Sequence, residues 1–223
     1  MINCAYLRRN ADRIWTAIFE HPFVRGIGEG TLVEDKFRFY LKQDYVYLIE
    51  FSRFFSLAAA KAGKLDQMQT FSKILDATLN LEMDLHRKIC ADYRITPEEL
   101  ESTEPAPNNL GYTSYLQSVA YSGDLVEILA ALLPCSWGYI EIAEHLKKKG
   151  LPEHKHYRQW IETYTSNEFV EMTDWLKATF DQLSEKLSED KAGRVQEIFK
   201  FSSLWELLFW EMAYYTQEWP VKN

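Results

Sequence analysis

The 223-residue sequence is poor in cysteine and lacks any long run of basic residues. Its three cysteines, Cys4, Cys90 and Cys135, are scattered along the chain and form no C-x-x-C pair. Such a set is typical of a reducing compartment and excludes a zinc cluster built from thiolates. Lysine and arginine total 25 against 33 acidic residues, a formal net charge of −8, and no basic run exceeds Lys147–Lys149. This balance argues against a protein that binds nucleic acid.

Apolar runs long enough for a membrane span are also missing from the sequence. The segment MINCAYLRRNADRIW at its start is polar and amphipathic, with no apolar core of the kind that signal peptides contain. No stretch approaches the roughly 20 uncharged apolar residues that cross a bilayer. We therefore expect a soluble cytoplasmic protein that makes no contact with a membrane.

Strand patterns and internal repeats are absent as well. No segment of useful length alternates apolar and polar residues, whereas apolar residues recur at helical spacing along most of the chain. The proline-rich segment 96–109 is too short, and its flanking helices are too apolar, for a domain boundary. The sequence therefore predicts one all-α domain over residues 1–223, built as a multi-helix bundle.

Apolar periodicity and turn-forming residues place the expected elements along the chain. Proline and three glycines predict a loop at residues 22–30. A helix over residues 65–93 is expected to turn Phe71, Leu75, Leu79 and Ile89 toward the interior. The expected helices cover residues 6–20, 36–62, 65–93, 111–121, 125–146, 153–165, 167–187 and 190–219, with a short helical turn at 97–100. Residues 153–165 and 167–187 form either two helices or one helix bent near Ser166.

The most apolar of these helices, residues 125–146, contains an unusual proline and cysteine. Pro134 removes a backbone donor inside the run, Cys135 follows at once, and Tyr139 lies one turn later on the same face. A thiol beside a helix irregularity and below a phenol is consistent with a reactive site. The alternative is a small core residue, which is the usual role of an isolated cysteine in an apolar helix.

Carboxylates also interrupt two other apolar helices. Asp44 lies beside Tyr45 and Tyr47, where it is either a ligand-binding carboxylate or a surface residue near the start of its helix. Glu206 and Glu211 interrupt the apolar stretch SSLWELLFWEMAYY and lie roughly 140° apart on a helix, so they cannot share one pocket face. Apolar neighbours favour Glu206 as the interior residue. A buried glutamate has a raised pKa and can transfer a proton near neutral pH.

Helical bundles can also hold di-iron sites, which are built from Glu-x-x-His pairs on facing helices. Here Glu82 and His86, and likewise Glu141 and His145, are spaced four residues apart rather than three. Both pairs lie among other charged residues, as on a solvated helix face. The sequence therefore predicts no metal site.

Several motifs, taken in order, resemble the thiaminase II (TenA) family over nearly the whole chain. HPFVRGIGEGTL and FRFYLKQDYVYL resemble the family's N-terminal signature, and LLPCSWGYIEIA resembles its catalytic-cysteine helix. LWELLFWEMAY, with a looser match around Tyr164, resembles its C-terminal motifs. The resemblance implies a haem-oxygenase-like helical fold without haem, often assembled as a homotetramer. Cys135 is the residue that places the chain in the cysteine-bearing branch.

The resemblance also implies roles for individual residues. Cys135 matches the nucleophile, Glu206 the acid/base carboxylate, and Asp44 the carboxylate that binds the aminopyrimidine edge. The remaining matches are polar or aromatic residues of the substrate pocket: Tyr47, Tyr112, Tyr139 and Tyr164.

The activity that the resemblance implies is that of an aminopyrimidine aminohydrolase, or thiaminase II. This hydrolase removes the substituent on the C5 methylene of a 4-amino-2-methylpyrimidine and gives 4-amino-5-hydroxymethyl-2-methylpyrimidine for thiamin salvage. The expected substrate is thiamin or one of its degradation products, and no metal or organic cofactor is expected. Two alternatives stay open: a non-haem di-iron oxidase of the same fold, and a non-catalytic regulator that binds a pyrimidine.

Overall fold

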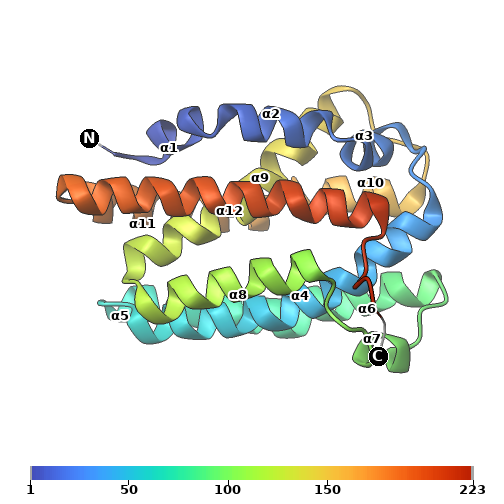
Figure 1. Cartoon of the computed structure of the whole chain (residues 1–223), viewed down its shortest axis with the longest axis horizontal. Helices are drawn as coiled ribbons and strands as arrows, with labels where there is room; N and C mark the ends of the chain where they lie inside the picture. The colour runs from blue at the N-terminus through green and yellow to red at the C-terminus, as the bar shows by residue number, and fades with distance from the viewer. Residues whose placement is uncertain (1, 222–223) are drawn as a thin grey trace. The chain divides into compact units, whose positions relative to one another are not determined.

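The protein, described here by a computed structural model, contains helices and connecting turns but no β-strand within residues 2–221 (Figure 1). This confirms the all-α fold predicted from the apolar periodicity. In chain order the elements are α1 (Cys4–Asn10), α2 (Asp12–Glu20), α3 (Pro22–Glu29), α4 (Glu34–Lys61), α5 (Leu65–Ala77), the π-helical turn η1 (Thr78–Glu82), α6 (Met83–Asp92), α7 (Pro97–Glu101), α8 (Pro107–Ser122), α9 (Leu125–Lys148), α10 (Lys155–Tyr164), α11 (Asn167–Ser184) and α12 (Glu189–Tyr215).

The described residues form two compact units. Unit 1 consists of residues 2–32 and 126–211, and it holds α1 to α3, α10, α11 and most of α9 and α12. Unit 2 consists of residues 33–125 and 212–221, and it holds α4 to α8. Large aromatic side chains are fully buried in both units. The single domain over residues 1–223 remains a prediction.

Helix α9 is the core helix of unit 1. Every side chain from residue 128 to residue 133 is fully buried. Among residues 2–221, α9 is the one helix long and apolar enough to cross a membrane, which the sequence analysis did not anticipate. However, 83% of its most apolar stretch is buried inside the protein, as in the core helix of a globular fold. Pro134 lies within α9 and does not end it.

Helix α3 shows that the loop predicted at residues 22–30 was wrong. Pro22 occupies the first turn, where the missing N–H has no helical partner to lose. The backbone N–H of Phe23 donates to Nδ1 of His21, which caps the helix, and the Phe23 side chain is fully buried. The helix ends at Gly30, whose φ of 72° is the left-handed conformation that glycine adopts readily. The proline and glycines therefore delimit and pack a short helix.

Helix α4 is the centre of unit 2, and α5, α6 and α8 pack against it. Figure 1 shows α8 running alongside α4. Glu34 and Asp35 lie in its first turn, where carboxylates interact favourably with the helix dipole. Its buried residues occupy much of its circumference, as predicted: Phe37, Tyr40, Leu41, Gln43, Tyr45, Tyr47, Leu48, Phe51, Ser52, Phe54, Phe55 and Ala58.

The helix expected over residues 65–93 is interrupted by the π-helical turn η1. The wider turn shifts the register, so that the buried positions run through Phe71 and Thr78 and then resume at Met83. Leu79, predicted to face inward, is instead 48% exposed. The prediction was wrong because a regular 3.6-residue count gives no sign of a π turn.

Other helix boundaries mostly follow the sequence. The short helix α7 forms as predicted, with a reciprocal capping box between Thr96 and Glu99. The segment after residue 153 forms two helices, and the Ser166 side chain caps the second by accepting from the Phe169 N–H. The single helix expected over residues 6–20 is divided into α1 and α2.

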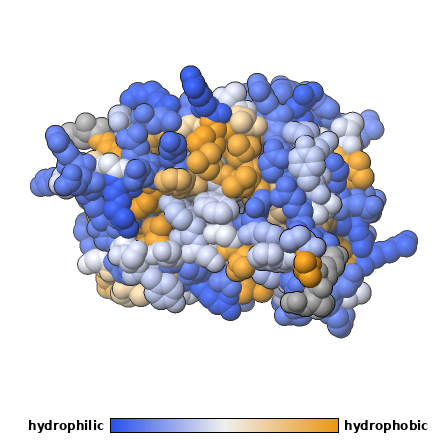
Figure 2. Space-filling view, viewed as in Figure 1, coloured by the Kyte–Doolittle hydropathy of each residue, from blue (hydrophilic) through white to orange (hydrophobic). Residues whose placement is uncertain are grey.

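The surface in Figure 2 is mainly hydrophilic, with apolar residues exposed in patches between the charged ones. Exposed apolar residues of unit 1 include Phe201 and Leu208 on α12. On the face shown in Figure 2, apolar residues are therefore a minority.

Candidate active site

The seven site residues predicted from the sequence divide between the two units. Unit 2 contributes Asp44, Tyr47 and Tyr112, from α4 and α8. Unit 1 contributes Cys135, Tyr139, Tyr164 and Glu206, from α9, α10 and α12. Within each unit these residues come from packed helices rather than from exposed loops.

Asp44 is mostly buried on α4, with 14% of its side chain exposed. It is therefore not the surface carboxylate that residue type alone allowed. Its Oδ2 atom lies 3.5 Å from Nε2 of His86, a residue of α6 that is itself 6% exposed. Burial lowers the pKa of His86 to about 4, so that the imidazole is neutral at neutral pH. A carboxylate and a neutral imidazole thus face each other inside unit 2.

Tyr47, which lies on α4 with Asp44, and Tyr112 of α8 form an aromatic surface in unit 2. Their ring centroids lie 5.5 Å apart, and Tyr47 also stacks on Phe51 at 5.2 Å. Both tyrosines are buried. Rings held in this way can bury the face of a flat heteroaromatic molecule. The structure therefore brings together two of the tyrosines that the sequence singled out.

Cys135 is partly exposed, although the helix that carries it is otherwise largely buried. Tyr139, one turn later, contacts the rings of Tyr164, Trp160 and Trp210 at centroid distances of 4.7, 5.6 and 5.4 Å. Cys135 and Tyr139 lie on the same helix, one turn apart, as predicted. The structure also brings Tyr164 to Tyr139, which sequence spacing alone did not require.

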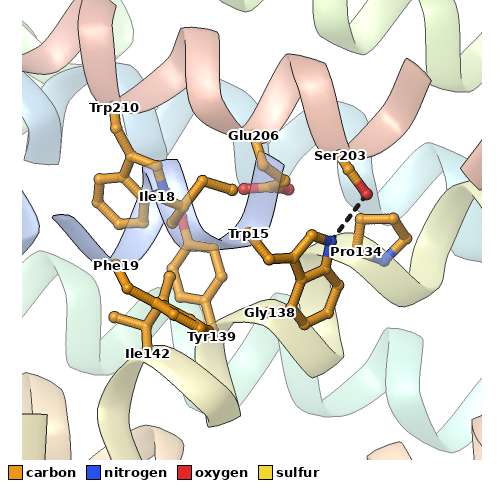
Figure 3. A pocket seen from close by; sticks show the side chains of 10 residues that line it. All are labelled: Trp15, Ile18, Phe19, Pro134, Gly138, Tyr139, Ile142, Ser203, Glu206 and Trp210. Atoms are coloured by element: carbon orange, nitrogen blue, oxygen red, sulfur yellow. Dashed lines mark hydrogen bonds between the residues drawn. The ribbon is translucent and has the colours of Figure 1, made fainter. Parts of the chain in front are cut away.

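Glu206 faces the interior of unit 1 and is 4% exposed, as predicted. Figure 3 shows it among the side chains that line a pocket. The volume of this pocket is about 10 Å³, roughly the space of one water molecule. Glu211 instead has 41% of its side chain exposed and lies 3.7 Å from Nε2 of His21. The pocket is lined by Trp15, Ile18, Phe19, Pro134, Gly138, Tyr139, Ile142, Ser203, Glu206 and Trp210.

The wall of this pocket is fixed by a hydrogen bond from α2 to α12 and by a second one within α12. The indole N–H of Trp15 donates to Oγ of Ser203 at 3.0 Å (Figure 3). The Ser203 hydroxyl in turn donates to the carbonyl of Phe199 at 2.9 Å. Both hydroxyl and indole are thereby satisfied in a buried setting, which holds the indole in one orientation.

Four residues around Asp44, Tyr139 and Glu206 were not predicted from the sequence. Trp210 follows Glu206 by one helical turn, so helical spacing would have found it. Trp15 and Trp160 are distant from Glu206 in sequence and gave no local signal. His86 was considered only as half of a Glu–His pair, because its contact with Asp44 depends on the packing of α6 against α4.

No group of three or more histidine, cysteine or acidic side chains within residues 2–221 lies close enough to hold a metal ion. Of the second Glu–His pair, Glu141 accepts from the Arg8 guanidinium at 2.9 Å, and His145 stacks on Phe19. The di-iron alternative therefore has no ligand cluster in the described part of the chain.

Comparisons with known proteins show which family the chain belongs to. Residues 8–216 match the TENA/THI-4/PQQC family. A protein of Halalkalibacterium halodurans named aminopyrimidine aminohydrolase is 46% identical over 96% of this chain and 96% of its own length. A TenA homologue from P. horikoshii superposes with a TM-score of 0.87 at 35% identity, covering 94% of this chain and 96% of its own.

The fold itself extends to a more distant structure. A domain of unknown function from Shewanella denitrificans, described as having a haem-oxygenase-like fold, superposes with a TM-score of 0.74 at 12% identity, covering 97% of this chain and 94% of its own. The expectation of a haem-oxygenase-like helical fold is thus confirmed. With a family match that spans nearly all of its residues, the chain belongs to the TENA/THI-4/PQQC family.

Proposed function

We propose that this chain is an aminopyrimidine aminohydrolase that acts in thiamin salvage. The observation that carries the proposal is the identity to the H. halodurans enzyme of that name over nearly the whole of both chains. The proposed reaction replaces the substituent on the C5 methylene of a 4-amino-2-methylpyrimidine with a hydroxyl group from water. The partly exposed thiol and the buried carboxylate described above supply the groups that such a reaction needs.

The first step assigned to Cys135 is nucleophilic attack. Its thiolate adds to the electron-poor pyrimidine ring, and the electron pair displaced into the ring expels the substituent from the C5 methylene. Water then bonds to the methylene carbon, and the C–S bond breaks to restore the aromatic ring and the thiolate. The net change consumes one water and releases the hydroxymethyl pyrimidine and the leaving group.

The proton transfers are assigned to Glu206. An amine is a poor leaving group unless it is protonated, so a carboxylic acid is needed in the first half of the reaction. The resulting carboxylate can then take a proton from the attacking water. The burial of Glu206 among aromatic side chains supports this role, because bulk water cannot compete for the proton there.

The remaining assigned residues bind the substrate. Asp44 accepts hydrogen bonds from the exocyclic amine and from a protonated ring nitrogen. Tyr47, Tyr112, Tyr139 and Tyr164 provide aromatic surface for the flat ring. No cofactor is assigned a part in this scheme.

A direct assay tests the proposal. Purified protein is incubated with 4-amino-5-aminomethyl-2-methylpyrimidine, its formyl derivative or thiamin, and the release of 4-amino-5-hydroxymethyl-2-methylpyrimidine is measured by chromatography. We expect release from at least one of the three substrates. Release from none of them, by protein that is folded by circular dichroism, would contradict the proposed function.

The proposal extends to assembly and location. We propose that the protein is a homotetramer, which the family resemblance supports. We also propose that it is located in the cytoplasm, which the three scattered cysteines support. Light scattering coupled to gel filtration gives the mass directly. A 26.3-kDa particle at assay concentrations would contradict the tetramer.

A further inference from the structure

A buried hydrogen bond joins α12 to α9 beside Pro134. The Ser202 hydroxyl of α12 donates to the backbone carbonyl of Ala131 on α9 at 2.5 Å, and both residues are completely buried. In a regular helix this carbonyl accepts from the backbone N–H of Cys135, four residues later. Pro134 has no N–H to donate to the preceding turn, so α9 lacks one helical hydrogen bond here. Ser202 therefore adds a bond from a neighbouring helix at the place where α9 has lost one of its own.

A second contact shows that α9 and α12 run in the same direction through unit 1. The ring centroids of Tyr139 on α9 and Trp210 on α12 lie 5.4 Å apart. From the hydrogen bond to this ring contact, α9 advances from Ala131 to Tyr139, and α12 advances from Ser202 to Trp210. The two helices thus advance by the same number of residues between the two contacts, which defines their register.

Cys135 and Glu206 each lie midway between these two contacts. Cys135 is four residues after Ala131, and Glu206 is four residues after Ser202. Each is therefore one helical turn, about 6 Å, beyond the same hydrogen bond. Figure 3 shows the Glu206 carboxylate pointing from α12 into the pocket that α9 also lines. The two residues assigned to catalysis are thus at the same level along the pair of helices.

We propose that Ser202 is a positioning residue, whose hydrogen bond to α9 fixes the register of α12 and so keeps Glu206 level with Cys135. The inference rests on the proposed function, in which these two residues act on one substrate. The contact between Tyr139 and Trp210 is largely apolar and has little directionality, whereas a hydrogen bond weakens steeply when its geometry changes. Catalysis is sensitive to such a change, because a misplacement of about 1 Å can cost about 100-fold in rate.

Three substitutions at residue 202 separate the hydroxyl from the space that it fills. Ser202→Ala removes the donor, Ser202→Cys fills a similar space with a weak donor, and Ser202→Thr keeps the hydroxyl. Ser184→Ala is the matched control. The Ser184 hydroxyl is also buried in unit 1, and it also donates to a distant backbone carbonyl, that of Ile2, at 3.1 Å. Ser184 lies at the end of α11 and does not line the Glu206 pocket.

Steady-state kinetics with the best substrate of the direct assay distinguish a positioning role from a structural one. We expect Ser202→Ala to lower kcat by about tenfold to 100-fold. KM should stay within about threefold of wild type, because Asp44, which is assigned to substrate binding, lies on α4. Ser202→Cys carries the same test if Ser202→Ala does not fold, and it should lower kcat by about fivefold or more. Ser202→Thr and Ser184→Ala should keep kcat within about threefold of wild type.

A double-mutant cycle tests whether Ser202 acts through Glu206. In Glu206→Gln the side chain no longer transfers the proton, so adding Ser202→Ala should lower kcat by less than about threefold further. A general structural role predicts instead the same loss in both backgrounds. An equal loss in both backgrounds would therefore overturn the inference.

The outcomes also separate this inference from the proposed function. Wild-type kcat in folded Ser202→Ala or Ser202→Cys would overturn the role of Ser202 and leave the proposed function in place. A kcat of Ser202→Thr as low as that of Ser202→Ala, in folded protein, would show that the hydroxyl does not matter and would have the same consequence. Absence of product from the folded wild-type protein would contradict the proposed function itself, and with it the inference.

Discussion

The three cysteines differ in burial, and two of them are kept as thiols by it. Burial raises the pKa of Cys90 to about 12, and burial together with Asp181 raises that of Cys4 well above its ordinary value. Cys135 is the partly exposed one of the three. Because the thiolate is the nucleophilic form, burial disfavours Cys4 and Cys90 for covalent catalysis, and its exposure favours Cys135.

We predict that Cys135→Ala lowers the rate of pyrimidine release by several orders of magnitude, because no other assigned group can form the covalent intermediate. The helical content measured by circular dichroism should not change. Cys4→Ala and Cys90→Ala should keep kcat within about threefold of wild type, since a buried thiol contributes mainly packing. Near wild-type turnover by Cys135→Ala would refute covalent catalysis at this residue.

The two glutamates near the end of α12 give a second test at the residue scale. Glu206 is buried in its aromatic pocket, whereas Glu211 is partly exposed beside His21. We predict that Glu206→Gln lowers kcat by about 100-fold or more, the usual contribution of a general acid or base. Glu211→Gln should lower kcat much less. An equal loss in both variants, measured with an amine-releasing substrate, would remove the proton-transfer role from Glu206.

What the sequence predicted at the residue scale depended on distance along the chain. Cys135 with Tyr139, and Glu206 against Glu211, could be placed because each pair lies on one helix, where the 3.6-residue period fixes direction. His86 could not be paired with Asp44 in this way. The two residues are on different helices, and only the packing of α6 against α4 brings them together.

At the scale of single elements, α3 shows why local composition was misleading. Its glycines were interpreted as loop formers, yet a Cβ atom at Gly26 would lie 3.0 Å from Cβ and 3.1 Å from Cα of Leu32. Glycine is therefore required inside the helix by the close approach of the chain that follows. That requirement arises from packing and cannot be distinguished in the sequence from a turn preference.

We predict opposite effects of alanine at two helical glycines. Gly26→Ala forces a methyl group against the backbone of Leu32 and should destabilise the protein by about 1 to 3 kcal/mol. Gly193→Ala, in the first part of α12, meets nothing within 4 Å and should stabilise it by about 0.5 to 1 kcal/mol, because alanine is the better helix former. Urea unfolding of both variants measures the difference. A stabilised Gly26→Ala would contradict the close packing of α3.

At the scale of the whole molecule, the pattern of helices was predictable and their irregularities were not. Apolar periodicity predicted the all-α class, the buried α9 and the positions of most helices. It missed η1, and with it the exposure of Leu79, because a regular 3.6-residue count gives no sign of a π turn. The activity was suggested by motifs in their order along the chain, since neither charge nor composition specifies a substrate.

The stability of the whole molecule should depend on pH through two groups of unit 2, the partly buried Glu82 and the buried His86, which titrate in opposite directions. Burial raises the pKa of Glu82 from 4.5 to about 7, although a hydrogen bond with Thr78 opposes the shift. Folded protein therefore keeps a proton that the unfolded chain releases, and stability falls as pH rises from about 4.5 to 7. Burial lowers the pKa of His86 from 6.5 to about 4, so stability falls as pH decreases through that range.

Because these two windows overlap, the contributions of Glu82 and His86 should nearly cancel in the wild-type protein between pH 5 and 6.5. In Glu82→Gln only the His86 contribution remains. The free energy of unfolding of this variant should therefore rise by up to about 2 kcal/mol as the pH increases from 5 to 6.5. In His86→Gln only the Glu82 contribution remains, so the free energy of unfolding of this variant should fall by a similar amount as the pH increases from 5 to 6.5. Thermal unfolding of the three proteins at pH 5, 5.75 and 6.5 measures these slopes relative to wild type. Parallel pH profiles for wild type and both variants would show that neither group titrates in the folded protein as its burial requires.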